Sequence, residues 1–105
     1  GKSSMSFSWG NILFHLVKSW QPETILEIGT CIGISSAYVD AALHANNKGE
    51  LISLERCDAL VPFINQNWKV LGVKHAQVRG GDITQLLNEI IDEGHVIDMV
   101  FDDEN

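Results

Sequence analysis

The chain has 105 residues, of which 45% are apolar and 20% charged, and its formal net charge is −7. This composition is typical of a soluble globular α/β chain with one core, and no apolar run approaches the ~18 residues of a membrane span. The seven Lys and Arg residues are scattered, which argues against nucleic acid as a partner because phosphate binding requires a basic face.

The N-terminal part of the chain predicts a helix and then a buried strand. Residues 8–20 carry apolar side chains at helical spacing, Ser8 is the expected N-cap, and Pro22 ends the pattern. The expected buried stripe of this helix is Ile12, Leu13, Leu16, Val17 and Trp20. Residues 1–7 are expected to form a flexible segment. Residues 24–28 then read as a strand, and a second helix is predicted from just after Gly33 to about residue 45.

The middle of the chain repeats this strand–helix order. Residues 46–49 predict a turn, and residues 51–54 predict a second strand that closes on Glu55. Asp58 is expected to cap a third helix that Gly72 ends. The expected inner side of that helix is Leu60, Val61, Ile64, Trp68 and Leu71.

The C-terminal part predicts a strand, a helix and a last strand. Residues 73–79 form the third, more polar strand, and Asp82 follows as a candidate helix cap. The next helix carries an apolar stripe and stops at Gly94. That stripe is Ile83, Leu86, Leu87, Ile90 and Ile91. Residues 96–101 form the fourth strand.

Strands that alternate with helices indicate an α/β fold with a parallel sheet of about four strands and right-handed crossovers. Ligands of such sheets bind beyond the carboxyl ends of the strands. The first predicted strand ends in a glycine turn, and the other three run into Glu55, Asp82 and Asp102. We therefore expect three carboxylates and the glycine turn to share one rim.

The glycine turn has the features of a ligand-binding turn. Gly29 and Gly33 permit positive φ and close approach of the backbone to a ligand. The N-terminus of the helix that follows suits a carboxylate or a phosphate. Glu55, 22 residues beyond Gly33, is placed to accept the hydroxyls of a ribose. The alternative for Glu55 is a solvated acid or a partner of Arg56.

Two further residues qualify this interpretation. Asp82 begins a capping box, so its carboxylate could simply satisfy backbone donors of the helix. Capping and ligand binding can coexist if one oxygen caps the helix and the other faces the base of a ligand. Cys31 occupies a position where the dinucleotide fingerprint requires glycine, which argues against a nicotinamide enzyme.

Four segments resemble motifs of one enzyme family. Residues 25–35 (Ile-Leu-Glu-Ile-Gly-Thr-Cys-Ile-Gly-Ile-Ser) resemble the first motif of class I S-adenosylmethionine-dependent methyltransferases, in the form of the catechol O-methyltransferase-like group. Residues 51–55, 81–82 and 97–102 resemble its later motifs, so the similarity covers roughly residues 10–105. It implies a truncated Rossmann-like class I fold, with residues 1–105 forming a single partial S-adenosylmethionine-binding domain.

The resemblance also implies roles for the residues of the rim. Four residues would surround the methionine part of the cofactor: Gly29, Thr30, Gly33 and Ser35. Glu55 would hold the ribose, and Asp82 would lie near the adenine amine. Glu27 would support the turn or reach the amino group of the cofactor.

Asp102 is the predicted catalytic residue. Methyl transfer from a sulfonium is an in-line displacement, so the protein must position the acceptor hydroxyl and help it to lose a proton. In metal-dependent members of the family an Asp that matches Asp102 binds a divalent cation such as Mg²⁺. Glu104 and Asn105 depart from that pattern, so metal dependence stays open.

The expected function is O-methylation of a small-molecule hydroxyl, with this chain as the cofactor-binding half. The alternative is a non-catalytic nucleotide-binding or assembly module, and a nicotinamide half-domain is a third hypothesis. The apolar edge of residues 96–101 predicts self-association, or else a fragment of a longer enzyme. Two cysteines without a signal peptide favour a cytoplasmic location, with no membrane partner.

Overall fold

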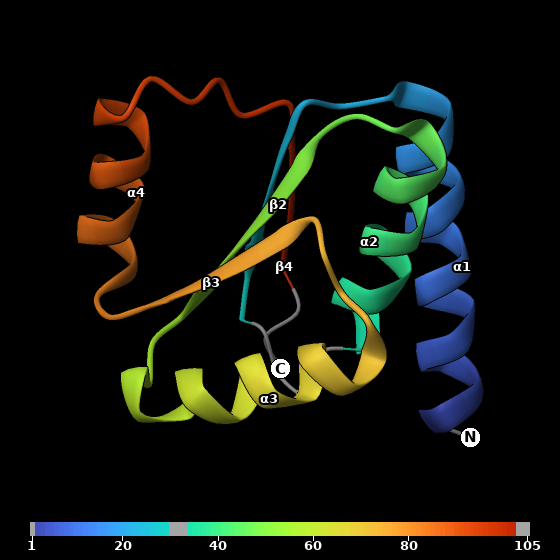
Figure 1. The fold of residues 1–105 in the computed structure, drawn as a ribbon, viewed down its shortest axis with the longest axis horizontal. Helices are drawn as coiled ribbons and strands as arrows, with labels where there is room; N and C mark the ends of the chain where they lie inside the picture. The colour runs from blue at the N-terminus through green and yellow to red at the C-terminus, as the bar shows by residue number, and fades with distance from the viewer. Residues whose placement is uncertain (1, 30–33, 103–105) are drawn as a thin grey trace.

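The computed structural model describes residues 2–29 and 34–102, with side chains from residue 9 onward. These residues form a parallel four-stranded sheet in the order β3-β2-β1-β4, flanked by helices (Figure 1). The strands are β1 (Thr24–Ile28), β2 (Glu50–Glu55), β3 (Ala76–Gly80) and β4 (Met99–Asp102). The helices are α1 (Lys2–Trp20), α2 (Ile34–Asn46), α3 (Val61–Leu71) and α4 (Ile83–Asp92), with a 3₁₀ turn η1 (Asp58–Leu60) before α3. The predicted α/β fold class is confirmed.

The sheet separates two apolar clusters. Helices α1 and α2 lie together on one side of it, and α4 lies on the other (Figure 1). The first cluster joins α1 and α2 to the sheet through Leu13, Val17, Ile25, Val39, Ala42, Leu43, Leu51 and Phe101. The second joins α4 to the sheet through Leu26, Ile52, Leu54, Leu86 and Ile90. Because β1 and β2 are buried on both faces, their sequences are almost continuously apolar.

Helix α1 differs from its prediction at both its start and its buried face. It begins at Lys2 rather than at Ser8, since no helix breaker precedes Ser8. Whether residues 1–7 are flexible in solution stays a prediction. Of the expected stripe, Leu13 and Val17 are buried, whereas Ile12, Leu16 and Trp20 are 50%, 38% and 68% exposed. The helix packs against the rest of the chain along one narrow face, so within the expected stripe only Leu13 and Val17, four residues apart, are buried.

The third and fourth helices bury narrower stripes than the sequence predicts. In α3 only Ile64 and Trp68 are buried, while Leu60 and Leu71 are about half exposed at 45% and 54%. Leu60 lies in the 3₁₀ turn, whose three-residue period moves it away from the inner side of the α-helix. In α4, Ile91 is 61% exposed, because this helix also packs against the sheet along a narrow face.

The expected Asp58 cap of the third helix is wrong, because Asp58 begins the 3₁₀ turn η1 and the N-cap of α3 is Leu60, which makes no side-chain cap hydrogen bond. The end of α3 and the start of α4 agree with the local sequence signals. Gly72 follows α3 with φ of 76°, and Asp82 is the N-cap of α4, its Oδ2 accepting the Gln85 N–H at 2.9 Å. Strands β3 and β4 begin three residues later than predicted. The residues before β4 form an irregular connection in which Val96 is 75% exposed. Within the described part of the chain, no helix is long and apolar enough to cross a membrane.

Candidate cofactor-binding site at the carboxyl edge of the sheet

The register of the sheet brings the predicted rim residues to one edge. Ile28 of β1 pairs with Leu54 of β2 and with Asp102 of β4, and Glu55 pairs with Gly80. All four strands are parallel, so these positions are the carboxyl ends. Gly29, Glu55, the β3–α4 connection and Asp102 therefore lie at a common edge, as the sequence predicts.

Gly29 makes the turn that ends β1. Its φ is 82°, a conformation that residues with a Cβ rarely adopt, and it is buried. Its N–H donates to the carbonyl oxygen of Leu54 at 2.9 Å, which ties the start of the turn to β2. The predicted site residues Thr30 and Gly33, and also Cys31, lie outside the described residues.

Glu27, two residues before Gly29 on β1, has no exposed surface. Its Oε1 accepts hydrogen bonds from the hydroxyl of Ser36 in the first turn of α2, at 2.6 Å, and from the hydroxyl of Ser53 in β2. This carboxylate therefore joins the end of β1 to α2 and to β2, in keeping with the predicted role in supporting the turn. Ser35, a predicted cofactor residue, is also buried in that first turn of α2.

Ser36 and Ser53 are residues that the sequence analysis missed. Both are fully buried. The signal was present, because an acid in the middle of a buried strand requires hydrogen-bond donors nearby. Ser53 is the register partner of Glu27, so strand pairing alone would have brought the two together.

Glu55 is half-buried and is fixed by hydrogen bonds from backbone N–H groups. Its Oε2 accepts the backbone N–H of Cys57 at 3.0 Å, and its carbonyl oxygen accepts the N–H of Gly81 at 2.9 Å. Among the described residues, no hydrogen bond engages its Oε1. The carboxylate is thus oriented by one oxygen and can accept hydrogen bonds from a ligand with the other.

Asp82 caps α4, which confirms the structural role that the sequence offered as the alternative. One oxygen is used for the cap, and the side chain is exposed at the rim. Asp102 is exposed at the end of β4, beside Ile28. In the described ranges 2–29 and 34–102, no three His, Cys, Asp or Glu side chains form a group that could hold a metal ion.

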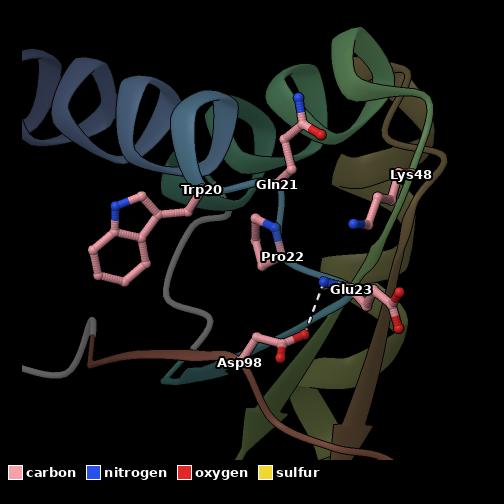
Figure 2. Close-up of a pocket in the computed structure, with 6 residues that line it drawn as sticks. All are labelled: Trp20, Gln21, Pro22, Glu23, Lys48 and Asp98. Carbon is pink, nitrogen blue, oxygen red and sulfur yellow. Dashed lines mark hydrogen bonds between the residues drawn. The ribbon is translucent and has the colours of Figure 1, made fainter.

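The opposite, amino edge of the sheet carries a different set of polar contacts. Oδ2 of Asp98 accepts the backbone N–H groups of Glu23 at 2.8 Å and Thr24 at 3.1 Å. These bonds hold the pKa of Asp98 below its ordinary value, and the bond from Thr24 has the larger effect. Asp98 also borders a cavity of about 240 Å³ between the end of α1 and Lys48, well away from the predicted rim (Figure 2).

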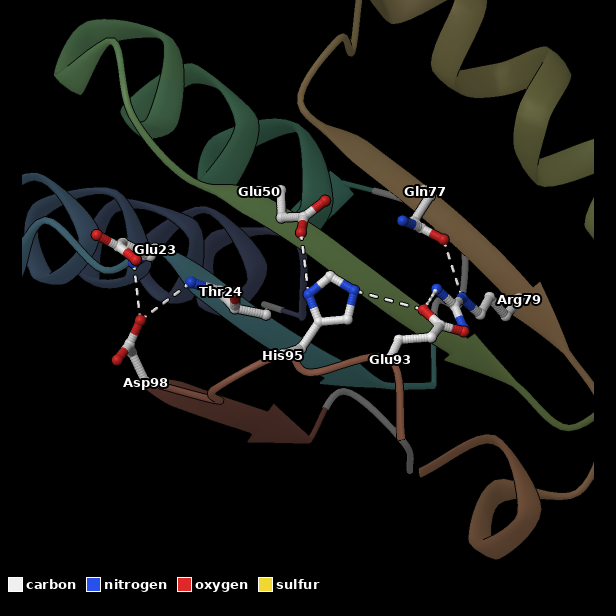
Figure 3. Close-up of polar contacts among 8 residues, drawn as sticks. All are labelled: Glu23, Thr24, Glu50, Gln77, Arg79, Glu93, His95 and Asp98. Atoms are coloured by element: carbon white, nitrogen blue, oxygen red, sulfur yellow. Dashed lines mark hydrogen bonds and ion pairs between the residues drawn. The ribbon is translucent and has the colours of Figure 1, made fainter. Parts of the chain in front are cut away.

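A second polar network fixes the connection between α4 and β4 (Figure 3). Arg79 of β3 donates two hydrogen bonds of 2.7 Å to the carboxylate of Glu93. This contact lowers the pKa of Glu93 and raises that of Arg79. His95 lies between Glu93 and Glu50, with nitrogen–oxygen distances of 3.4 and 3.3 Å. These groups hold the connection against β2 and β3 and take no part in the rim.

Known proteins resemble the chain over nearly all of its length. No protein-family profile matches it. The catechol O-methyltransferase of Niastella koreensis is 32% identical over 102 residues, a match that covers 95% of this chain and 45% of that protein. The O-methyltransferase TomG from Streptomyces achromogenes, involved in tomaymycin synthesis and solved in complex with SAM, has a TM-score of 0.78 at 30% identity. That match covers 91% of this chain and 43% of TomG. The chain is thus similar in sequence and in fold to catechol O-methyltransferase-like O-methyltransferases over part of their length.

The homology extends over the N-terminal part of these enzymes. The O-methyltransferase from Bacillus cereus, solved in complex with SAH, has a TM-score of 0.81 at 26% identity and is covered over 44% of its length. The sheet described above thus matches part of a class I methyltransferase structure. The chain spans less than half the length of these O-methyltransferases.

Proposed function

We propose that the chain binds S-adenosylmethionine at the carboxyl edge of its sheet, as the cofactor-binding part of an O-methyltransferase. The observation that carries the proposal is the placement of Gly29 and Glu55 at the ends of neighbouring strands, joined by the Gly29–Leu54 hydrogen bond. A left-handed glycine next to an oriented carboxylate fits the two ends of an adenosyl ligand. The SAM and SAH in the two similar structures support the same ligand.

Each rim residue has a role in this proposal. Gly29, Thr30, Gly33 and Ser35 surround the methionine part of the cofactor. Glu55 accepts the ribose hydroxyls, because its Oε1 faces no other described partner. Asp82 lies near the adenine amine while it caps α4. Glu27, whose Oε1 accepts hydrogen bonds from Ser36 and Ser53, supports the turn or reaches the amino group of the cofactor.

The proposed reaction is methylation of a hydroxyl group on a small molecule. When bound, S-adenosylmethionine supplies an electrophilic methyl group on a sulfonium. Asp102, at the exposed end of β4, is proposed to orient the acceptor hydroxyl and to take its proton as the oxygen–carbon bond forms. Asp102 would suit Mg²⁺ as an oxygen ligand, but the described residues offer no set of ligands around it, so no step is assigned to a metal.

The two ends of β2 provide a matched test of the cofactor site. Glu55 lies at the carboxyl end of this strand, and Glu50 lies at the amino end, where it faces His95. Glu55→Gln should weaken binding of S-adenosylhomocysteine about 10- to 100-fold, since hydrogen bonds to a charged group are lost. Glu50→Gln should leave the affinity unchanged. Isothermal titration calorimetry measures both, and equal affinities for the two variants would contradict the proposal.

A non-catalytic nucleotide-binding or assembly module is the second candidate, because the chain spans less than half of its O-methyltransferase relatives. Binding of S-adenosylhomocysteine without methyl transfer to a panel of catechols would favour it. Binding of NAD in preference to S-adenosylhomocysteine would instead favour a nicotinamide protein. A cytoplasmic location stays a prediction.

We also propose that two copies associate along β4. This strand pairs with β1 on one side and forms the edge of the described sheet, and Val100 on it is 55% exposed. Edge strands with exposed apolar residues pair readily with other chains. Light scattering should give a mass above that of one chain, reduced by Val100→Lys but not by Val70→Lys on the outer side of α3. A monomer at all concentrations would contradict self-association.

A further inference from the structure

Two histidines face each other far from the carboxyl edge. His44 lies in the last turn of α2, and His75 precedes the first residue of β3. The Nδ1 atom of His44 is 3.3 Å from the Nε2 atom of His75. The ring centroids are 5.5 Å apart and the rings are tilted by 43°, so the two nitrogens approach each other while the rings do not stack.

The backbone of His75 is fixed on both sides. Its N–H donates to Oδ1 of Asp40 at 2.6 Å, and its carbonyl oxygen accepts the N–H of Leu51 at 2.8 Å. Asp40 is only 7% exposed and also accepts the N–H of Lys74. Asp40 lies four residues before His44, so the two side chains share one face of α2. This face carries the His44 imidazole, and through Asp40 it also fixes the backbone of His75. The pair is therefore held in place before any ligand binds.

The separation of the two nitrogens suits a shared metal ion. Metal–nitrogen bonds of about 2.0–2.1 Å in a tetrahedral site place two ligand nitrogens about 3.3 Å apart. We propose that His44 and His75 together bind one divalent transition-metal ion of the Zn²⁺, Ni²⁺ or Cu²⁺ class, with water completing its coordination. Imidazole nitrogen is a preferred ligand for these ions, whereas Mg²⁺ prefers oxygen.

The surroundings of the pair favour a cation and leave room for it. The carboxylate of Asp40 contributes negative charge, and the carboxyl end of α2 carries the negative pole of the helix dipole. His44 is exposed and His75 is half-buried, so an ion and its water ligands can reach the nitrogens. In the metal-free protein one ring donates a hydrogen to the other. On binding, the donor ring carries that hydrogen on its second nitrogen, and both facing nitrogens ligate the metal.

The site has two protein ligands, because the described residues supply no group of three or more metal-binding side chains. We therefore expect weaker binding than in closed four-ligand zinc sites. A bound ion would join the end of α2 to the start of β3 and raise the melting temperature as its concentration rises. This inference is independent of the proposed cofactor site, which lies at the other edge of the sheet.

The test compares three histidine variants of the protein by calorimetric titration with Ni²⁺ and with Cu²⁺ in a buffer without chelators. The wild type should bind one ion per chain, with Cu²⁺ bound more tightly than Ni²⁺. His44→Gln and His75→Gln should each lower the affinity by at least about tenfold. His15→Gln is the matched control, since His15 is exposed on α1 and its ring contacts Phe14. Its affinity should equal that of the wild type.

A measurement on the wild type avoids any dependence on how the variants fold. Sub-stoichiometric Ni²⁺ should broaden the imidazole proton resonances of His44 and His75 before those of His15 and His95. The proposal is overturned if the wild type shows no saturable one-to-one binding, or if His15 or His95 broadens first. It is also overturned if either His44→Gln or His75→Gln binds as tightly as His15→Gln.

Discussion

Removing the two serine hydroxyls that bond to Glu27 should strongly destabilise the protein. Glu27, Ser36 and Ser53 have no exposed surface, so water cannot replace a lost hydrogen bond. The 2.6 Å contact from Ser36 has the length of a charge-assisted O–H···O⁻ bond. A hydrogen bond to a charged group contributes about 1.5–3 kcal/mol, so Ser36→Ala and Ser53→Ala should each cost that amount.

The double variant should cost more than either single variant, up to about 6 kcal/mol where the two losses add. That is a large share of the about 5–15 kcal/mol by which small domains are stable. Urea unfolding followed by far-UV circular dichroism gives the free energy of unfolding by linear extrapolation. Ser19→Ala, an exposed serine on α1, is the control and should change stability by less than about 0.5 kcal/mol.

A third substitution tests the cause of this effect. If the penalty comes from the buried carboxylate, adding Glu27→Met to the double variant should recover part of the lost stability, because an apolar side chain needs no donors. The reasoning is refuted if the double variant loses less than about 1 kcal/mol. A further loss on adding Glu27→Met would show that packing, and not the charge, sets the cost.

Two other substitutions test contacts elsewhere in the fold. Gly10→Ala places a Cβ 2.5 Å from the Tyr38 ring. The steric clash should cost about 1–3 kcal/mol of stability, more than the about 1 kcal/mol by which alanine is favoured over glycine in a helix. The melting temperature should therefore fall, and a rise would contradict the close contact of α1 with α2. Asp98→Asn removes a carboxyl group whose pKa is lowered by hydrogen bonds from the Thr24 and Glu23 N–H groups. The ionised carboxylate therefore stabilises the fold at neutral pH, because neutral pH lies above the ordinary pKa of the group. The stability difference between wild type and variant should shrink as pH falls through the lowered pKa, and a constant difference in melts across the acid range would count against it.

The amino-acid sequence by itself determined the elements whose signals lie within a few residues. The apolar runs of β1 and β2, the left-handed Gly72 after α3 and the Asp82 cap of α4 all depend on neighbouring backbone groups. The parallel direction of the strands followed from the helices that connect them. The position of Gly29 and Glu55 at the same carboxyl edge of the sheet followed from that direction. Local chemistry and chain connectivity were sufficient for these.

Only the tertiary structure decided which side chains are covered and which distant polar groups meet. Leu13 is buried and Ile12 is exposed on the same helix, because burial depends on where α1 packs against the rest of the chain. Ser36 meets Glu27, and His44 meets His75, through contacts between elements that are separate in the sequence. Helical periodicity defines an apolar face only to within a broad arc, and no local signal measures a distance between two elements. The packing of helices against the sheet fixes both.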